Sequence, residues 1–496
     1  MAITIIKNLI SNQFYPSANP ISVSIDSNNS GKCNFRYICD IWINGQKATT
    51  LKLFPDPVTG YGLFEISRVL GDYISTYENL TNFTNLLDAA QQVALPTSAF
   101  KIQLKFGEEY DLTQTCDGAI LQYANLATSN TAYVFESAVD FFDYPTFTPG
   151  QFIVGTTSAT ASFLTNSPRD IDITYNDGYY VDFLTLQTIN VANWRVDIKT
   201  FDASGLGVGT HSFAAAKTHT NIFRFRIACG PLDINSVSAT TTINKQISYY
   251  TMQLRYVPTG AYVTEIFTFR LKEPTTFRHR FGFTGQGGAP ESFTFFHRLR
   301  KTLDIQKGLY NKSFDLSYGG TPQYNLGGRG TDIFSIRATE TAQVSTFVKE
   351  QFSRFLTELY LSKSVWFLLR PELIPFRSIN DGGVNKLVIF DFENAVGLAK
   401  DTPINKLSVG DLIYVYADNS NYNGRFSITN ISSGVLTTSA TWSALPNTCG
   451  WLHKSTAWRK APIIINNSSV EIQQRLGRPI QYTMDFAFSN TKNLLK

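Results

Sequence analysis

Charged residues are scarce in this chain. Asp, Glu, Lys and Arg make up 17% of its 496 residues, against about 25% in an average soluble protein. The formal net charge is only +4, and no block of lysines and arginines marks a nucleic-acid-binding tract. The richest basic stretches are Arg278–Arg280 and Arg298–Lys301. We interpret them as solvated strand flanks, with contact to an acidic partner surface as the alternative.

Cysteine and histidine are also rare, with five of each. No CxxC or Cys/His spacing of a metal site is present, so the sequence predicts neither a metal nor another cofactor. Because their number is odd and they are widely spaced, we expect the cysteines to be buried free thiols that pack as small hydrophobic residues, in a reducing compartment. A disulfide between Cys33 and Cys39 is the minor alternative. The five are Cys33, Cys39, Cys116, Cys229 and Cys449.

Long hydrophobic runs and enzyme motifs are missing as well. No apolar run approaches the roughly 18–20 residues that span a membrane as a helix. The N-terminus lacks the basic start and apolar core of a signal peptide, so we expect synthesis in the cytosol. The G-x-S-x-G, P-loop, H-E-x-x-H and EF-hand motifs do not occur. The carboxylate pairs Glu108/Glu109 and Asp170/Asp172 could suggest glycoside hydrolysis, but acidic residues at strand ends are common, and we predict no enzyme.

Aromatic residues are abundant, at 14% of the chain, and they lie in short stretches that alternate apolar and polar positions. Phe and Tyr favour half-buried sheet surfaces. In one such stretch Phe223, Phe225 and Ile227 alternate with Arg224 and Arg226, which predicts an antiparallel sheet with one wet face. The fold class that follows is mainly β, with several β-sandwich domains of immunoglobulin or fibronectin type in tandem.

Length and turn signals divide the chain into four predicted parts. Residues 1–112 form an N-terminal β-sandwich and residues 113–240 a second one. Residues 241–386 and 455–496 together form a third β domain. Residues 387–454 show a different pattern, in which short strands are joined by tight turns. This pattern predicts a small β-barrel inserted at a loop tip. We expect a protein without residues 387–454 to fold.

The third domain holds the clearest helix signal, one amphipathic helix near residues 348–361. Four apolar residues follow the i, i+3, i+4, i+7 spacing of a single helical face. They are Phe352, Phe355, Leu356 and Leu359. A continuous apolar run of strand length follows at Val365–Leu369 and contains Trp366. We predict that the sheets pack around this helix, and these five side chains are structural candidates, not catalytic ones.

Several sequence passages outside residues 387–454 together carry a resemblance to a known group of proteins. They are Tyr15–Pro20, the series Pro55–Pro57, Gly60–Gly62 and Glu65–Ser67, then Lys105–Tyr110, Phe163–Pro168, Phe281–Phe296 and Phe355–Trp366. Together they resemble virion structural proteins of tailed phages that infect Bacteroidetes, including the crAss-like group. The resemblance implies chains of β-sandwich domains that end in a helix-plus-strand segment. The insert at residues 387–454 departs from the shared pattern.

The resemblance also implies a function. It points to a subunit of the tail, collar or baseplate, located in the virion, that assembles as a homo-oligomeric ring around the DNA-ejection conduit. Sixfold or twelvefold symmetry is usual in that setting. The implied partners are neighbouring tail, collar or portal-proximal proteins, and genomic DNA in the lumen is a further candidate. Low charge and many aromatics agree with large interfaces, which are enriched in Tyr, Phe and Arg.

Two rival functions belong to other classes. The first is a receptor- or glycan-binding tail protein with residues 387–454 as the adhesin. Trp442, Trp451 and Trp458 would then stack on sugars, whereas the simpler interpretation is core and interface packing. The second is a tail-associated depolymerase, for which the carboxylate pairs are the only candidates.

Overall fold

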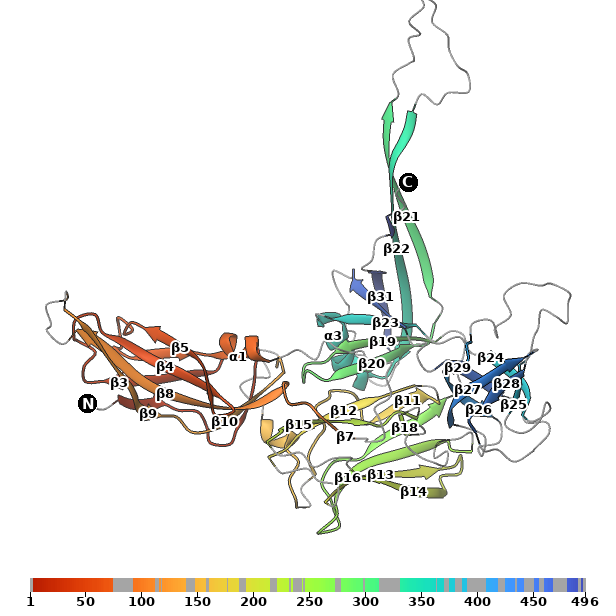
Figure 1. The fold of residues 1–496 in the computed structure, drawn as a ribbon, viewed down its shortest axis with the longest axis horizontal. Coiled ribbons are helices and arrows are strands. Elements are labelled where there is room, and N and C mark those ends of the chain that lie inside the picture. Colours follow the sequence, from red (N-terminus) through yellow and green to blue (C-terminus); the bar gives the residue numbers. More distant parts are fainter. Residues whose placement is uncertain are drawn as a thin grey trace, which may run out of the picture. The chain divides into compact units, whose positions relative to one another are not determined.

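Strands dominate the structure (Figure 1), and the prediction of a mainly β protein is confirmed. This computed structural model describes residues 3–493 except 75–91, 112–115, 117, 140–147, 158–159, 176, 187–192, 215–220, 232, 235–242, 244–245, 273–277, 298, 312–330, 363, 370–373, 380–385, 390–406, 418–423, 433–434, 441–449, 455–458, 467–479 and 489–491. The chain divides into two compact units. The first comprises Met1–Glu273, Thr284–Glu291 and Glu372–Ala457, and the second Pro274–Phe283, Ser292–Pro371 and Trp458–Lys496.

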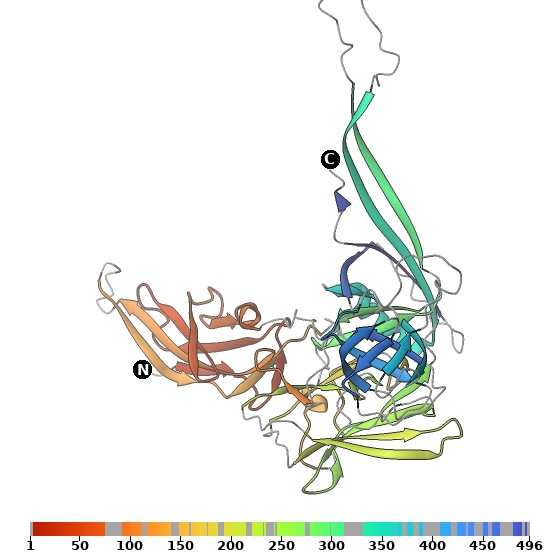
Figure 2. The same cartoon turned by 45° about the vertical axis from the view of Figure 1, so that its right-hand side comes forward.

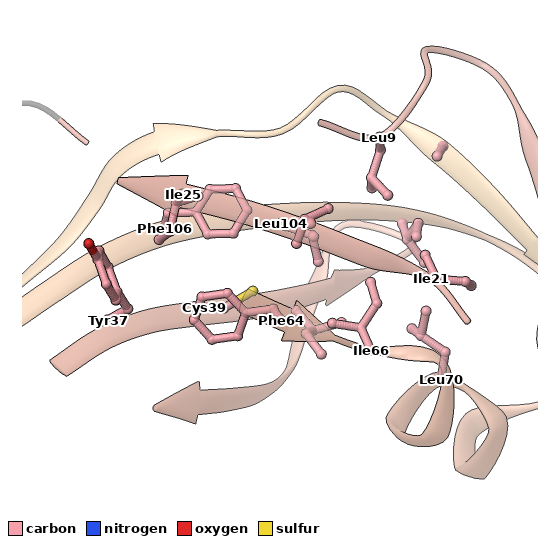
Figure 3. Packing of buried hydrophobic residues seen from close by; sticks show 14 of the residues in the cluster. Leu9, Ile21, Ile25, Tyr37, Cys39, Phe64, Ile66, Leu70, Leu104 and Phe106 are labelled. Carbon is pink, nitrogen blue, oxygen red and sulfur yellow. The ribbon is translucent and has the colours of Figure 1, made fainter. Parts of the chain in front are cut away.

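Two sheets at the start of the first unit share one hydrophobic core. A three-stranded sheet has the order β1-β3-β6, and a six-stranded sheet has the order β2-β10-β8-β4-β5, with β9 paired to β8. Figure 3 shows side chains of both sheets meeting in that core, among them Ile25, Phe64, Leu104 and Phe106. The elements are β1 (Ile3–Lys7), β2 (Phe14–Pro16), β3 (Ser22–Ser27), β4 (Arg36–Ile43), β5 (Gln46–Leu53), β6 (Gly62–Glu65), α1 (Ser67–Tyr73), β8 (Ala99–Asp111), β9 (Ile120–Thr128) and β10 (Ala132–Phe135).

The predicted end of this sandwich at residue 112 is wrong. Strands β9 and β10 both pair antiparallel with β8, so the sandwich continues to Phe135. Alternation along a strand shows which face is apolar, but it carries no information on which sheet the strand joins. That choice depends on pairing with strands far away in the sequence.

Two of the cysteines are paired. Cys33 and Cys116, which are 83 positions apart, form a disulfide, so the interpretation of all five as free thiols is wrong for these two. Cys39 and Cys229 are free and buried, and burial raises the pKa of both thiols. Cys449 lies outside the described residues. The Cys33–Cys116 link closes a loop that includes β4 and β8, a contact that spacing alone does not reveal.

A second pair of sheets follows in the same unit. One has the order β11-β18-β16-β13-β14, with β17 paired to β16, and the other has the order β12-β15-β7. The predicted boundary at residue 240 is therefore wrong, because β16 and β18 complete the sheet of β11 and β13. The elements are β7 (Gln92–Ala94), η3 (Pro149–Phe152), β11 (Asp170–Thr174), β12 (Tyr180–Leu184), β13 (Trp194–Phe201), β14 (Gly207–Ala214), β15 (Arg224–Ala228), β16 (Tyr249–Tyr256), β17 (Ala261–Tyr262) and β18 (Phe267–Lys272).

One large sheet forms the second unit. Its order is β20-β19-β23-β30-β31-β22-β21, and β32 pairs with β22 as the eighth strand. A short helix, α3, follows a 3-10 turn, η4, and packs on one face of this sheet. The elements are β19 (His279–Thr284), β20 (Pro290–Phe295), β21 (Arg300–Asn311), β22 (Thr331–Val348), η4 (Glu350–Phe352), α3 (Ser353–Leu361), β23 (Val365–Leu369), β30 (Arg459–Ile465), β31 (Ile480–Phe488) and β32 (Lys492–Asn493).

The structural candidates from the sequence lie at this helix. Phe355, Leu356 and Leu359 are buried together in the core of the large sheet, as their spacing predicts. Phe352 lies in the preceding 3-10 turn and packs half-buried against the same core. Trp366 is buried in β23, where it pairs in register with Gly282 and Pro462 outside that core cluster. The helix packs on one sheet, so the prediction that several sheets pack around it is wrong.

Six strands close into a barrel in the order β24-β25-β28-β27-β26-β29. They are β24 (Ile374–Ile379), β25 (Lys386–Ile389), β26 (Leu412–Ala417), β27 (Gly424–Ser432), β28 (Val435–Thr438) and β29 (Gly450–Lys454). The predicted start of this segment at residue 387 is wrong, because it cuts β25 and omits β24. The barrel is inserted between β23 and β30, which are antiparallel partners with Leu369 opposite Arg459.

Candidate functional site

The outer part of the long hairpin of β21 and β22 has fewer paired strands beside it than its base. Near its base β22 is flanked on the other side by β31, from Thr341 to Val348, and by β32 at Arg337 and Ala338. Farther out, among the described strands, only β21 pairs with Thr331–Ile336. We call β21 together with Thr331–Glu340 the arm. Figure 2 shows the arm extending as a two-stranded ribbon. An isolated two-stranded ribbon is marginally stable in water.

One face of the arm is apolar although it is exposed. Leu303, Ile305 and Leu309 have 54%, 53% and 59% of their surface exposed. Residues opposite one another in an antiparallel ladder share a face, and Ile333 lies opposite Leu309 while Ile336 lies opposite Lys307. These five apolar residues define the apolar face: Leu303, Ile305, Leu309, Ile333 and Ile336.

The opposite face of the arm is mainly polar, with Tyr310 as an exposed aromatic residue. Thr302 and Asp304 alternate with the apolar residues of β21, and Thr341 and Thr339 lie opposite them on β22. Gln306 continues the row, and all of these side chains are at least partly exposed. The arm is therefore amphipathic with a period of two, the pattern of a strand that covers a core on one side only.

The apolar face continues a core. Ala342 and Val344 of β22 are buried in the hydrophobic cluster of the large sheet, and Ala342 lies opposite Lys301 on the same face as Leu303. Along β22 the same alternation leads outward to Ile336. The arm thus extends the buried face of the sheet into a region where Leu303, Ile305 and Leu309 are each more than half exposed.

Charges are interspersed with this apolar face. Lys301 and Glu340 form an ion pair of 2.6 Å between the two strands. Lys307 lies between Ile305 and Leu309 in the alternation of β21. Both signs of charge are therefore present on one face. Single lysines on a long exposed strand are a common device that limits indiscriminate edge-to-edge aggregation.

The basic stretches of the sequence do not form one exposed patch. Arg280 is buried and donates a hydrogen bond of 2.6 Å to Ser292 Oγ. The Arg278 guanidinium lies 5.1 Å from the centre of the Phe296 ring. Only Arg300 and Lys301 line an open groove of about 650 Å³ at the base of the arm, together with His297, Leu299, Gln343, Val344, Ser345, Gln481 and Thr483. Arg298 lies outside the described residues.

A buried charge cluster occupies the face of β15 that the sequence predicted to be wet. Asp182 accepts hydrogen bonds from Arg224 and Arg226 at 2.8–3.0 Å, and all three side chains are almost fully buried. Arg224 also donates to the Glu136 carbonyl oxygen at 3.1 Å. Polar alternation in a sequence cannot distinguish a solvated face from a buried ion pair, so the prediction of a wet face is wrong here.

The ionisation of Asp182 follows from this arrangement. Burial alone would raise its pKa, because a charged carboxylate is costly away from water. The charges of Arg226 and Arg224 and their hydrogen bonds outweigh burial, so the pKa of Asp182 is lower than its ordinary value. The cluster is closed to solvent and every carboxylate oxygen of Asp182 is bonded to a guanidinium. We infer that it has a structural role.

The carboxylate pairs considered for catalysis are each engaged with separate partners. Glu108 accepts hydrogen bonds from Ser27 and Asn29, whereas Glu109 accepts one of 2.6 Å from Lys52. Asp170 binds Arg270 at 2.8 Å, and Asp172 lies 3.7 Å from Lys272. Glu108 and Glu109 are neighbours on β8 and point to opposite faces of the sheet. Asp170 and Asp172 share one face of β11, but each lies beside its own basic residue of β18.

The part of the chain that the structure describes has neither a metal-ligand cluster nor a helix that could span a membrane. No three side chains of His, Cys, Asp or Glu there gather closely enough to hold a metal ion. Among the described residues, no helix has the length and apolar character to cross a membrane. Of the tryptophans considered for sugar stacking, Trp442 and Trp458 lie outside the described residues, and Trp451 belongs to β29.

Comparison with known proteins adds little. No protein-family model matches the chain, and no curated protein matches it. Two crystal structures of Parabacteroides merdae β-glucuronidase, one with glycerol in its active site, are similar at 9% identity and a TM-score of 0.13. The matches cover 56% of this chain but 31% and 30% of the glucuronidase chains, about a third of their length. A TM-score this low carries no argument about fold or activity.

The sequence interpretation missed the arm. The signal was present in the strict alternation of Lys301, Leu303, Ile305 and Lys307 with Thr302, Asp304 and Gln306. That alternation predicts a strand with one apolar face. It does not predict that the face is left exposed.

Proposed function

We propose that this protein is a non-catalytic structural subunit that assembles with copies of itself into a ring of a phage tail, collar or baseplate. The observation that carries the proposal is the arm, whose apolar face is exposed in the single chain. Monomeric proteins rarely leave several large apolar side chains exposed together on one face of a sheet. Assembly would cover them.

The gain from covering the apolar face is large enough to matter. Full burial of a Leu or Ile side chain contributes about 1.5–3 kcal/mol. Leu303, Ile305 and Leu309 are each slightly more than half exposed, so covering them adds on the order of 1 kcal/mol apiece at each contact between copies. A closed ring repeats this contact once per subunit, since a head-to-tail interface that closes generates a ring.

The phage setting of the proposal rests on the sequence resemblance. In that setting the ring surrounds the path of the genome, and its neighbours are other tail, collar or portal-proximal proteins. Location in the virion follows from the same resemblance. The amphipathic arm is compatible with such a conduit, because one face is polar while the other is suited to contact with protein.

The mass of the purified full-length protein tests this function. We expect sedimentation velocity at low and moderate salt, with negative-stain images of the same sample, to show closed rings of one size. Sixfold or twelvefold rings are the expected forms. A monomer at all protein concentrations, with no ring in the images, would contradict the proposal.

A further inference from the structure

We propose that this protein binds a hexuronic acid unit of an acidic polysaccharide in a pocket between its first two sandwiches. The pocket has a volume of about 390 Å³, a size that is usual for small-molecule sites in proteins. Its lining combines strands of the N-terminal sandwich with the segment that precedes β15. The inference goes beyond the proposed function, because binding of a sugar does not depend on assembly into a ring.

One wall of the pocket is the outer face of the six-stranded sheet. Trp42 of β4 lies opposite Gln103 of β8, and residues opposite one another in an antiparallel ladder share a face. Lys101 is two positions from Gln103 on β8 and therefore lies on the same face. Leu104 and Phe106 of β8 point the other way, into the core of the sandwich. The sheet thus presents Trp42, Lys101 and Gln103 together to the pocket.

The turn between β4 and β5 holds the backbone of Lys101. Asn44 and Gly45 have φ angles of 48° and 82°, as an Asn-Gly hairpin turn requires. The Asn44 backbone N–H donates to the Lys101 carbonyl oxygen at 2.9 Å, and Asn44 Oδ1 accepts from the Lys101 backbone N–H at 3.1 Å. Both residues line the pocket. Asn44 Nδ2 and Lys101 Nζ have no partner among the described residues, so both are available to a ligand.

The second sandwich contributes another wall. Phe223 belongs to a hydrophobic cluster with Phe14 and Phe135, and its ring centre lies 4.6 Å from that of Tyr133. These contacts hold the segment of Phe223 against the N-terminal sandwich. Asn221, two positions earlier, is exposed and also lines the pocket. Ligand sites occur preferentially at such junctions between domains.

The lining has the chemistry of a sugar site. Trp42 and Phe223 supply aromatic surface, and the negative face of an aromatic ring attracts the weakly positive C–H groups of a pyranose. Lys105 Nζ lies 3.6 Å from the centre of the Trp42 ring and helps to hold that ring in place. The side-chain amides of Gln103 and Asn221 have no partner among the described residues. Each amide can donate to one hydroxyl group and accept from another.

The charge of the lining favours an acidic sugar over a neutral one. Lys101 has no ion-pair partner in the part of the chain that the structure describes, and no described carboxylate lines the pocket. Hydrogen bonds between an ammonium group and a carboxylate are stronger than those between neutral groups. A hexuronic acid carries one carboxylate beside several hydroxyl groups, so it complements one ammonium group beside several amides.

A nucleic-acid strand fits the pocket less well. Proteins that bind single strands combine aromatic stacking with a positively charged groove that follows the backbone. On this face of the sheet Lys47 is paired with Asp40 at 2.8 Å, and Lys52 is paired with Glu109 at 2.6 Å. These carboxylates interrupt the positive charge around the pocket, so the face does not offer a continuous basic track.

Isothermal titration of the full-length chain with tetragalacturonic acid and with its methyl ester tests the role of the carboxylate. We expect the natural chain to bind the acid at least about 10-fold more tightly than the ester, since the ester presents no charge to Lys101. Lys101→Gln should reduce this preference to less than about 3-fold. Lys52→Gln is the matched control, because Lys52 lies on the same face outside the pocket, and it should keep the preference.

Two further variants test the contacts to the hydroxyl groups. Asn221→Gly removes one amide, and glycine keeps the φ angle of 58° at this position without strain. Gln103→Ala removes the other amide. We expect each variant to weaken binding of the acid about 5- to 10-fold and to leave its preference over the ester unchanged, because both ligands carry the same hydroxyl groups. A melting temperature like that of the natural chain would show that both variants remain folded.

The outcomes bear on the pocket and not on the ring. A hyaluronan tetrasaccharide supplies glucuronic acid in place of galacturonic acid, and failure of the natural chain to bind either oligosaccharide would overturn the inference. Equal affinity of the natural chain and Lys101→Gln for the acid would overturn it as well. Tighter binding of a short oligothymidylate than of both oligosaccharides, lost in Lys101→Gln, would overturn it in favour of a nucleic acid.

Discussion

The sequence around Arg224 and Arg226 does not reveal that these two residues form buried ion pairs. Arg224 and Arg226 occupy alternate positions on a strand, which is the usual place for solvated side chains. The structure instead places both against Asp182, out of reach of water. A buried ion pair of this kind is strongly destabilised when one partner is removed, because the remaining charge has no counterion.

Asp182→Asn tests this dependence. We expect the free energy of unfolding, measured by urea titration, to fall by about 3–5 kcal/mol, since two guanidiniums would stay buried without the carboxylate. Asp170→Asn is the control, because Asp170 forms an ion pair with Arg270 in which both side chains are well exposed, and its loss should cost no more than about 1 kcal/mol. Equal effects of the two substitutions would show that the cluster is not buried as described.

The same carboxylate predicts a pH dependence. The pKa of Asp182 is lowered in the folded protein, from an ordinary value of about 3.9. Its contribution to stability is therefore fully present above about pH 4 and is lost as the pH falls through the folded pKa. Urea titrations between neutral and acid pH should show the natural chain approaching the stability of Asp182→Asn as the pH falls. A difference between them that stays constant into strong acid would contradict this assignment.

Phe355 provides the corresponding test in the second unit. Its side chain is 1% exposed, and its ring centre lies 5.2 Å from that of Phe283 and 6.2 Å from that of Phe293. Phe355→Ala should reduce the free energy of unfolding by about 3–5 kcal/mol. Leu361→Ala, at a site 69% exposed in the same helix, should change it by about 0.5 kcal/mol or less. A loss below about 1 kcal/mol at Phe355 would mean that the helix packs elsewhere.

At the scale of elements, the periodicity of apolar residues predicts single helices and strands but does not predict which strands pair. The helix could be predicted because Phe355, Leu356 and Leu359 repeat at a spacing that only a helix places on one face. Strands such as Tyr249–Tyr256 could be predicted from their alternation. Strand partners could not, because β9 joins β8 and β16 joins β13 through contacts that the alternation of each strand leaves open. The Cys33–Cys116 disulfide is non-local in the same way.

The inserted barrel supplies a prediction about elements. Because Leu369 and Arg459 are opposite one another across β23 and β30, the chain leaves and re-enters the large sheet at one place. Replacing residues 370–458 by an Asn-Gly turn should therefore leave a soluble protein whose second unit unfolds cooperatively, as measured by hydrogen–deuterium exchange of β23 and β30.

The shorter deletion of residues 387–454, which the sequence alone suggested would be tolerated, is the comparison for the excision of residues 370–458. It removes the partners of β24 and leaves Ile374 and Phe376, which are 3% and 2% exposed in the barrel, without a core. We expect that product to aggregate. A soluble product from this deletion together with an insoluble one from the longer excision would show that the barrel boundaries are misplaced.

At the scale of the whole molecule, the arm distinguishes this chain from a string of self-sufficient sandwiches. The other described sheets bury at least one face within the chain, whereas Leu303, Ile305 and Leu309 extend a core face into solvent. The sequence contains the alternation that makes this arm, and the sequence resemblance supplies the expectation of a ring. Neither shows that Leu303, Ile305 and Leu309 stay exposed on the arm, which is what connects the fold to assembly.

An electron cryomicroscopy reconstruction of the purified full-length protein tests the central claim most directly. The account predicts a closed ring in which Leu303, Ile305 and Leu309 of each copy are covered by a neighbouring copy. A ring held together by other surfaces, with these three side chains exposed to solvent, would contradict the role proposed for the arm. Particles that are single chains under all conditions would contradict the ring itself.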